Sequence, residues 1–569
     1  MPPKLQSKGI HMVPGRKTLI SPDHPSYKWW LTATLVVGSM TVGFAERMIE
    51  IAIPQIMVAL RVNLDQAQWI RTGPAIVRTI LGPTVGWLSS IFGIRQIYVA
   101  TIVLFIVGSG FAGAAWSFGT LIFFLALKNA GGGLRQPLSM SILYRSFPPH
   151  QRGLAMGFYQ ASHMMGPLFA PVLAGWLVEN FGWRSVFYIN IPINLLALLL
   201  VMAVMPKDLD AQEKKRPPSV DFLGLASMGT CLSTLLWAVN NGQTLGWDSP
   251  QIMSLFSISA IAGSLFVITE LNSEYPIVEL RVFKNISFTL SFLVRLFNTG
   301  IFFSTNFIFG IFIQRELKFT PLQAGQRLMP MAFASGVGGI FWGYISDKIR
   351  IPTVISISLL ASSITMYLYS MMELGTSLTF IIAVTIFQAL FRSGSQATMI
   401  RLSLSTLPSD KVTLGAGLDS LARNLGNTIG VPLITAFVTK RQSVRLAGHM
   451  RTHTVNPESN QALNSLQRAL EQAGEPPARA RMSSLRILRD QITQRATIES
   501  FHDGYRLAAL TGIFLIPLVL MIRSIHDEGR IRRGGAHGQG GTAEGGTSNI
   551  EQSNIKESQS NDSSKQGNP

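Results

Sequence analysis

The stretches GWLSSIFGIRQ (86–96) and GYISDKIRI (343–351) carry one pattern twice in the chain. Each begins with a glycine near the end of an apolar run. Each then reaches a short basic turn, with Arg95 in the first copy and Lys348 and Arg350 in the second. The second copy follows the first by eight apolar runs, which corresponds to a repeat of six runs with two further runs inserted. We therefore predict two related halves.

Long apolar runs fill the sequence around these two stretches. Of the 569 residues 47% are apolar and only 14% are charged, against roughly 25% charged in soluble domains. A helix of about 20 apolar residues crosses a hydrocarbon core, and no run alternates as the strands of a barrel do. We predict an all-α membrane protein with fourteen transmembrane helices, at 30–56, 67–92, 95–116, 118–146, 153–178, 184–205, 221–241, 251–270, 287–314, 320–346, 351–373, 376–405, 411–438 and 503–525.

Lysine and arginine in the short connections predict the orientation. They gather in alternate connections, whereas those near 117, at 242–250 and near 374 carry none. The positive-inside rule then places both termini in the cytoplasm of a multi-pass protein of the cell membrane, the inner membrane in a Gram-negative cell. The rule also accounts for the net charge of +18 without nucleic acid. The single cysteine, Cys231, excludes a disulfide framework.

The predicted runs divide the chain into successive segments. The first apolar run has no cleavage site after it and is expected to be an uncleaved span. The tail is rich in Gly, Ser, Asn and Gln and is expected to be disordered. The segments are a cytoplasmic N-terminal segment (1–29), an N-terminal six-helix bundle (30–205), a cytoplasmic linker (206–220), two extra central helices (221–270), a C-terminal six-helix bundle (287–525) with an external connection (440–502), and the tail (526–569).

The stretch GPLFAPVLAGW (166–176) predicts a closely packed, bent span. Gly166, Ala170, Ala174 and Gly175 form a stripe of small residues that lets neighbouring helices approach. Pro167 and Pro171 each remove a backbone hydrogen bond. Such a helix suits the interface between two halves, and ordinary packing of small residues is the alternative.

These motifs together resemble the major facilitator superfamily, and the span count resembles its EmrB/QacA-type branch of drug:proton antiporters. The stretches GWRSVFYINIPIN (182–194), NGQTLGWDSP (241–250), YPIVELRVFKN (275–285) and ARNLGNTIG (422–430) fall in that branch's order. The resemblance covers roughly 28–525 and implies a transporter that opens alternately to each side. It implies structural or gating roles for Gly86, Gly93, Arg95, Gly166, Pro167, Pro171, Gly175, Gly343 and Asp347.

The chain departs from the family pattern at several positions. Ser90 and Ile91 stand where the family usually has Asp and Arg in the first repeat. Ala45 replaces an acid of the first span, and Leu125 replaces an arginine of the fourth. Coupling roles known for those family residues therefore do not transfer to this chain.

Charged residues inside the predicted spans are the best functional evidence, because ionisable groups are costly in a bilayer. Glu46 and Glu50 share a helix face, and a carboxyl group in a low-dielectric surrounding can hold a proton near neutral pH. We predict that these two acids and Asp419 couple transport to protons. Bases outnumber acids, which favours anions, and the predicted substrate-binding residues are Arg78, Lys128, Arg135, Arg392 and His163.

Structural alternatives remain for several embedded charges. Arg71 and Arg401 lie near span ends, where their side chains can reach the membrane surface. Asp419 and Arg423, four residues apart, can form an intrahelical ion pair. His163 can be a hydrogen-bonded packing residue.

The sequence thus predicts a secondary transporter, with proton-coupled export of an amphipathic or anionic organic compound. No cofactor, enzyme activity or metal site is expected: no phosphate loop is present, and HMRTH (449–453) lacks a third ligand nearby. The expected partners are a small-molecule substrate, protons, the lipid bilayer and a periplasmic adaptor protein. The alternatives are a non-transporting sensor or scaffold on a degenerate transporter fold, an importer of an organic anion, and a membrane enzyme acting on lipids.

The external connection 440–502 is the exception to the charge rule, with ten bases and five acids. A connection of this length can cross the membrane regardless of its charge. Apolar residues recur at helical spacing in 462–473 and 482–501, with Pro476 and Pro477 between them. We predict either a helix–turn–helix cap, which docks the adaptor or covers the cavity, or a solvated connector.

Overall fold

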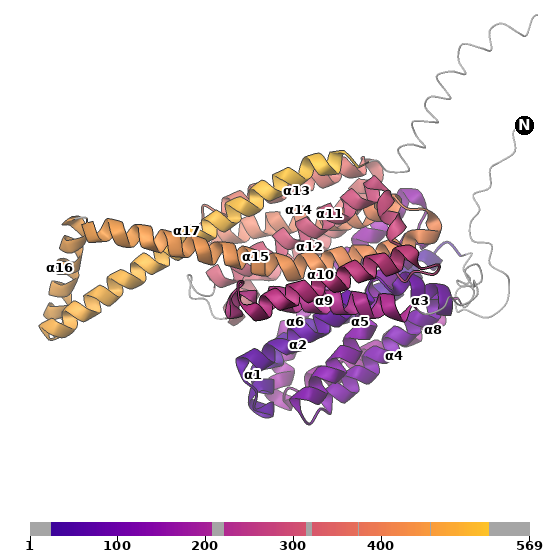
Figure 1. Cartoon of the computed structure of the whole chain (residues 1–569), viewed down its shortest axis with the longest axis horizontal. Helices are drawn as coiled ribbons and strands as arrows, with labels where there is room; N and C mark the ends of the chain where they lie inside the picture. Colours follow the sequence, from indigo (N-terminus) through magenta and orange to yellow (C-terminus); the bar gives the residue numbers. More distant parts are fainter. Residues whose placement is uncertain (1–23, 207–220, 314–320, 374, 456, 523–569) are drawn as a thin grey trace, which may run out of the picture. The chain divides into compact units, whose positions relative to one another are not determined.

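The computed structural model describes residues 24–206, 221–313, 321–373, 375–455 and 457–522 (Figure 1). Most of the predicted N-terminal segment, nearly all of the linker and the whole predicted tail lie outside these residues. All regular structure in the described residues is helical, as predicted. The order is α1 (Tyr27–Leu60), α2 (Leu64–Leu81), α3 (Val85–Phe92), α4 (Ile94–Gly113), α5 (Phe118–Ser146), η1 (Pro149–Gln151), α6 (Arg152–Phe181), α7 (Ser185–Tyr188), α8 (Asn190–Val204), α9 (Phe222–Leu245), α10 (Pro250–Asn272), η3 (Leu280–Lys284), α11 (Ile286–Ile311), α12 (Pro321–Lys348), α13 (Ile351–Tyr369), α14 (Leu378–Ser405), η5 (Ser409–Lys411), α15 (Val412–Val455), α16 (Pro457–Gln472) and α17 (Pro477–Leu520).

Each of the fourteen predicted runs coincides with one helix or with a broken pair of helices. Within the described part, nine helices are long and apolar enough to cross a membrane, and α2 with α3, bent by 59°, would make a tenth. Helices α1, α5 and α15, which carry embedded charges, are not in this set. The helical, membrane-spanning fold is confirmed, and the count of fourteen stays a prediction.

The run predicted as one helix at 67–92 is broken. α2 ends at Leu81 and α3 begins at Val85, and the segment GPT (82–84) lies between them. Pro83 has no N–H to donate to the preceding turn, and its ring crowds the carbonyl of that turn. The span is therefore a bent pair of helices.

The two halves use the same packing scheme, which confirms the predicted repeat. In the first half α1 packs on α6, and α5 packs on both α2 and α4. In the second half α11 packs on α15, and α14 packs on both α12 and α13. We call α1–α8 the N-terminal bundle, and α11–α15 with α17 the C-terminal bundle. The described chain up to Ile522 forms one compact unit, so the predicted domain boundaries stay predictions.

Three consecutive glycines set the packing of the N-terminal bundle. A Cβ at Gly131 would lie 2.4 Å from the Thr101 carbonyl of α4, and one at Gly133 would lie 2.9 Å from the Cα of Arg78 on α2. Gly132 faces Val42 of α1 at an ordinary 3.4 Å. Without side chains at these positions, α5 can approach α4 and α2 closely while it packs on α1, as small residues allow between membrane helices.

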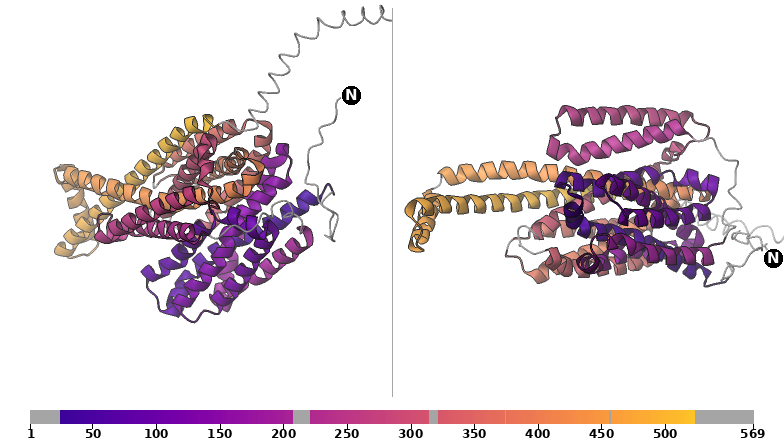
Figure 2. Two further views of the ribbon diagram at one scale, coloured as in Figure 1. Left: turned by 45° about the vertical axis from the view of Figure 1, so that its right-hand side comes forward. Right: turned by 90° about the horizontal axis from the view of Figure 1, so that it is seen from below.

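The two extra helices, α9 and α10, pack on each other as an antiparallel pair. The pair lies beside the helices of the two bundles, as the right-hand view of Figure 2 shows. α9 contacts both α2 and α15, one helix from each bundle. Trp237 of α9 meets Trp69 of α2 edge to face at 5.8 Å.

The predicted external connection 440–502 is almost entirely helical. α15 continues to Val455, so about the first quarter of the connection extends the predicted span instead of forming a loop. α16 and α17 follow, separated by a turn at 473–476, which confirms a helix–turn–helix. α17 runs unbroken from Pro477 to Leu520, so the second helix of this unit and the last predicted span are one helix. We call the part of α15–α17 between 440 and 502 the hairpin (Figure 1).

Candidate transport pathway between the two bundles

The two bundles meet through glycines at one end of the molecule. We call this end the basic end, because it carries the connections with Arg95, Arg145 to Arg152, and Lys348 with Arg350. A Cβ at Gly157 of α6 would lie 2.5 Å from the Gly339 carbonyl of α12, and one at Gly343 would lie 2.5 Å from the Gly153 carbonyl. The second copy of the repeated motif therefore lies directly on the N-terminal bundle.

Asp347, predicted as a gating residue, connects the bundles at this end. Its carboxylate accepts hydrogen bonds from the backbone N–H groups of Gly153 (2.8 Å) and Leu154 (2.9 Å). These groups belong to the first turn of α6, where the helix dipole favours a negative charge. Arg401 of α14 pairs with the same carboxylate at 3.1 Å and donates to the Pro149 carbonyl at 3.3 Å. Arg401 is therefore a partner of Asp347 rather than a side chain that reaches the membrane surface.

The first copy of the motif makes a similar approach without a carboxylate. A Cβ at Gly86 would lie 3.1 Å from the Cα of Leu414 on α15. Ser90, which stands where the family has an acid, donates to the Trp87 carbonyl of its own helix at 2.8 Å. It makes no described bond to the other bundle.

Hydroxyl groups bridge the bundles on this side instead. Ser141 and Thr413 lie 2.8 Å apart, and Arg145 donates to Thr413 at 3.0 Å. The basic end is thus held by a buried carboxylate on one side and by hydroxyls on the other.

Gly93 and Arg95 act inside the N-terminal bundle. Gly93 has a φ of 89°, which L side chains rarely adopt, and it joins α3 to α4. Arg95 donates to the Met202 carbonyl at the end of α8 at 3.3 Å. These two residues form the turn between helices, and the structure shows them within one bundle.

The stripe of small residues in α6 is only partly a packing surface. A Cβ at Gly166 would lie 2.6 Å from the Met40 carbonyl of α1, and Ala170 and Ala174 are fully buried. Gly175 faces open space, so it does not bring helices together. Pro167 and Pro171 lie within one helix, α6, and their effect on transport remains a prediction.

Acids and bases pair along α1 and α2, further from the basic end. Glu46 forms an ion pair with Arg78, and their side chains are 38% and 25% exposed. Glu50 pairs with Arg47 at 2.7 Å and with Arg71 at 3.6 Å. Both acids that we predicted to bind protons are therefore ion-paired, and both side chains are partly exposed.

Two predicted substrate cations, Lys128 and Arg135, lie inside the N-terminal bundle. Their exposed fractions are 1% and 0%. Both contact the ring of Phe105, whose centre lies 4.9 Å from Lys128 Nζ and 4.6 Å from Arg135 Cζ. Arg135 donates to Asn194 at 2.7 Å, whereas Lys128 Nζ has no hydrogen-bond partner among the described residues. Cation–π contact with Phe105 contributes to stabilising both charges.

The C-terminal bundle also buries charges. Asp419 pairs with Arg295 of α11 at 3.3 Å, and Arg295 also donates to Gln396 at 2.6 Å. The alternative of an intrahelical pair between Asp419 and Arg423 is not found, since the buried carboxylate of Asp419 faces Arg295 of α11. Arg392, 8% exposed, lies over the ring of Phe302.

Arg423 crosses the interface at mid-depth instead. It donates to the Oε1 atom of Gln136 on α5, in the other bundle. The amide nitrogen of Gln136 lies 3.1 Å from Nε2 of His163, and the Tyr159 hydroxyl donates to the Gln136 carbonyl at 3.3 Å. Sequence reasoning missed Gln136, although it follows Arg135 directly, because a neutral amide gives no signal in a search for charges.

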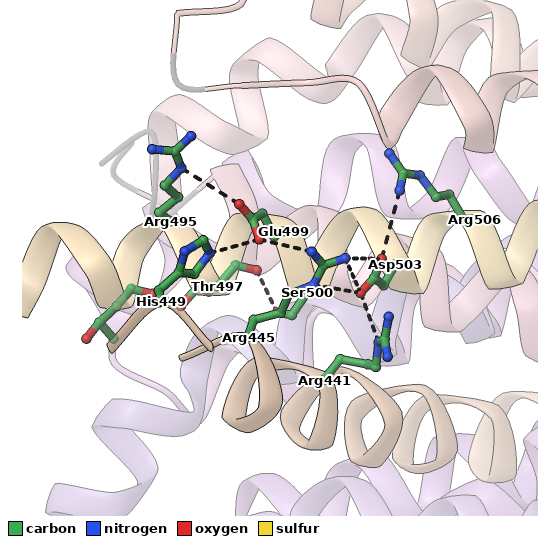
Figure 3. Close-up of polar contacts among 10 residues, drawn as sticks. Arg441, Arg445, His449, Arg495, Thr497, Glu499, Ser500, Asp503 and Arg506 are labelled. Carbon is green, nitrogen blue, oxygen red and sulfur yellow. Dashed lines mark hydrogen bonds and ion pairs between the residues drawn. The ribbon is translucent and has the colours of Figure 1, made fainter. Parts of the chain in front are cut away.

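A second polar network closes the hairpin (Figure 3). Arg441 and Arg445 of α15 contact Asp503 of α17 at 2.9 and 3.0 Å. Arg445 and His449 contact Glu499 at 3.2 and 3.0 Å. His449 belongs to the HMRTH stretch, and within the described residues no group of metal-binding side chains occurs. The network ties the two long helices together where they leave the bundle.

Similarity to known proteins agrees with this architecture. The chain is 28% identical over 411 residues to the "Uncharacterized MFS-type transporter YhcA" of Bacillus subtilis (strain 168). The matched region covers 72% of this chain and 76% of that protein. It is 25% identical over 479 residues to the "Multidrug export protein EmrB" of Escherichia coli (strain K12), with 83% of this chain and 90% of that protein covered. It is 24% identical over 529 residues to the "Fatty acid resistance protein FarB" of Neisseria gonorrhoeae, with 90% of this chain and 100% of that protein covered.

The fold has solved counterparts as well. The structure of the MFS proton:xylose symporter XylE superposes with a TM-score of 0.57 at 13% identity, with 88% of this chain and 96% of that chain covered. At this identity the likeness concerns the fold alone. The sequence pattern of the family described as Major Facilitator Superfamily matches residues 35–293 and 288–448, most of the described chain. The chain belongs to the Major Facilitator Superfamily.

Proposed function

We propose that this transporter exports amphipathic organic compounds, anionic ones among them, in exchange for protons. The membership in the superfamily makes it a secondary transporter in the membrane. Relatives named for multidrug export and for fatty acid resistance favour export and an amphipathic substrate. The proposal places the basic end in the cytoplasm, in agreement with the positive-inside rule.

The observation that carries proton coupling is the ion pair between Glu46 and Arg78. Both side chains are partly exposed, and the proposal requires that water reach the acid through the pathway. A proton on Glu46 cancels the negative charge of the pair and leaves Arg78 without a counter-ion in a low-dielectric surrounding. Protonation therefore changes the charge at a partly exposed site of the N-terminal bundle, which is what coupling requires.

The packing supports alternating access. The described glycine and polar contacts between the bundles lie at the basic end or at mid-depth, and the Glu46 and Glu50 pairs lie beyond them. If the basic end is cytoplasmic, this conformation is closed toward the cytoplasm. Loss of the contacts at Asp347 and Thr413 would open the pathway to that side.

Transport by purified protein in liposomes tests the proposal. We expect a proton gradient to drive accumulation of dansyl-undecanoic acid. We expect the double variant Glu46→Gln, Glu50→Gln to lose this dependence while it inserts normally, because an amide cannot bind the proton. Glu179→Gln, an exposed acid near the end of α6, is the matched control and should behave as the parent. Full proton-driven transport by the double variant would remove both acids from the mechanism.

The same ion pair favours a second candidate, uptake of an organic anion together with protons. When Glu46 is protonated, Arg78 is free to bind an anion, so proton and anion would bind together rather than exclude each other. The sign of the gradient separates the two candidates. Accumulation driven by an acidic interior of inside-out vesicles indicates exchange, and accumulation driven by an acidic exterior indicates joint transport.

The hairpin supports the expectation of a periplasmic adaptor. Its helices continue well beyond the apolar part of α15 and α17. Arginines at 479, 481, 486 and 489 are exposed and have no acid partner among the described residues. We propose that this surface docks an adaptor with acidic side chains, in the inner membrane of a Gram-negative cell.

A further inference from the structure

Arg423 differs from the other embedded cations in its surroundings. Its side chain is partly exposed, and it has no carboxylate within ion-pair distance among the described residues. Its acceptors are amide oxygens, Oε1 of Gln136 and Oδ1 of Asn424, the second at 3.4 Å. A guanidinium at the interface of two bundles is thus satisfied only by neutral groups.

The other candidate cations are less suited to receive a substrate. Arg78 and Arg295 already hold carboxylates. Lys128 and Arg135 are closed inside one bundle, and Arg392 is only 8% exposed. Each would need either a displaced acid or an opened bundle before it could touch a transported molecule.

Gln136 is held in an orientation that an anion can displace. Its amide nitrogen meets His163, and His163 packs edge to face on Tyr159 with ring centres 4.8 Å apart. The carbonyl oxygen of the amide is therefore turned toward Arg423. A charged acceptor bonds a guanidinium about twice as strongly as a neutral one, and a carboxylate can bind it through both oxygens.

We propose that Arg423 binds the carboxylate of the transported compound, and that Gln136 occupies this place when no substrate is bound. The proposal rests on the proposed function and adds the substrate class and the residue that selects it. Asn427 lies one turn further on the same face of α15 and is exposed, which provides a second polar group beside the site. Because Gln136 and Arg423 belong to different bundles, substrate binding also removes a bond that joins them.

Binding of a matched pair of probes tests the assignment. Dansyl-undecanoic acid and its methyl ester differ only in the charge, and their fluorescence reports binding to purified protein. We expect Arg423→Gln to weaken binding of the acid about tenfold or more and to leave the ester within about twofold, as expected for loss of a charge-assisted bond. Arg423→Lys, which keeps the charge, should retain part of the preference. Arg281→Gln, at an exposed arginine of η3, is the matched control and should change neither probe.

Substitution of Gln136 supplies an independent test, because it changes the group that faces Arg423 and leaves the cation in place. Gln136→Glu places a permanent carboxylate against Arg423 and should abolish the preference for the acid, whereas Gln136→Leu should keep or increase it. Arg423→Gln with an unchanged ratio of acid to ester affinity would overturn the assignment, and so would a normal preference in Gln136→Glu. If the parent protein binds the acid through Arg423 but shows no proton-driven transport, the proposed function fails and the binding site stands.

Discussion

Single buried charges in this protein differ in whether a partner satisfies them. Arg135 donates to Asn194, and Arg295 holds Asp419, whereas the ammonium of Lys128 contacts aromatic rings and has no hydrogen-bond partner in the described part of the chain. A buried polar group without a hydrogen bond costs roughly 1–3 kcal/mol. Lys128 is therefore one position at which a buried, unsatisfied group lowers the stability of the N-terminal bundle.

Replacing Lys128 with Met shows whether this charge serves transport. Exchange of a buried charge for an apolar side chain of similar volume is often neutral or stabilises by about 1–4 kcal/mol. We expect Lys128→Met to raise the thermal unfolding midpoint in detergent and, given its burial, to leave transport of the dansyl acid unchanged. Lys128→Gln, which keeps an unsatisfied polar group, should not stabilise. Loss of transport in a stabilised Lys128→Met protein would instead support the substrate-binding role that the sequence predicts.

At the scale of elements, the packing of α6 on α12 determines whether the basic end can close. Gly157 leaves no space for a side chain, since its Cβ would lie 2.5 Å from a backbone oxygen. Backbone cannot move aside as a flexible side chain can, because packed interiors shift only in discrete rearrangements. The closed basic end therefore requires glycine at this position.

Gly157→Leu tests this requirement against a control in the same helix. We expect the variant to fold but to lose about nine-tenths or more of its transport rate, because one state of the alternating cycle is excluded. Gly175→Leu introduces the same side chain where the structure has open space and should transport normally. Size-exclusion profiles and proton-driven uptake measure the two properties. Equal transport by both variants would show that the glycine contact is not needed.

Elements and repeats were predictable because they depend on local patterns. The apolar runs gave the helices, and the repeated motif placed Gly86 and Gly343 at equivalent interfaces. The partners of the charged residues were not predictable. Asp347 caps a helix that begins almost two hundred residues earlier, and Arg423 bonds a residue 287 positions away. Spacing along one helix instead suggested that Asp419 and Arg423 form a pair, which the fold replaces with Arg295.

At the scale of the whole molecule, the hairpin is separable from the transport pathway. The bonds of Arg441, Arg445 and His449 to Glu499 and Asp503 close the two helices before the hairpin extends further. A cut beyond this network leaves all five residues in place. Truncation can therefore test docking without opening the bundle.

We expect a variant with residues 455–495 replaced by a Gly/Ser linker to fold and to transport normally in liposomes. The same variant should lose export in cells if the arginine-rich surface docks an adaptor, because the transporter would no longer pass the exported compound to that adaptor. Accumulation of the dansyl acid in cells, beside uptake by the purified protein, measures both. As a control, Arg445→Gln with Asp503→Asn breaks the network itself and should lower the unfolding midpoint in detergent without removing the docking surface. Unaltered export in cells by the truncated protein would show that the hairpin is only a connector between two helices.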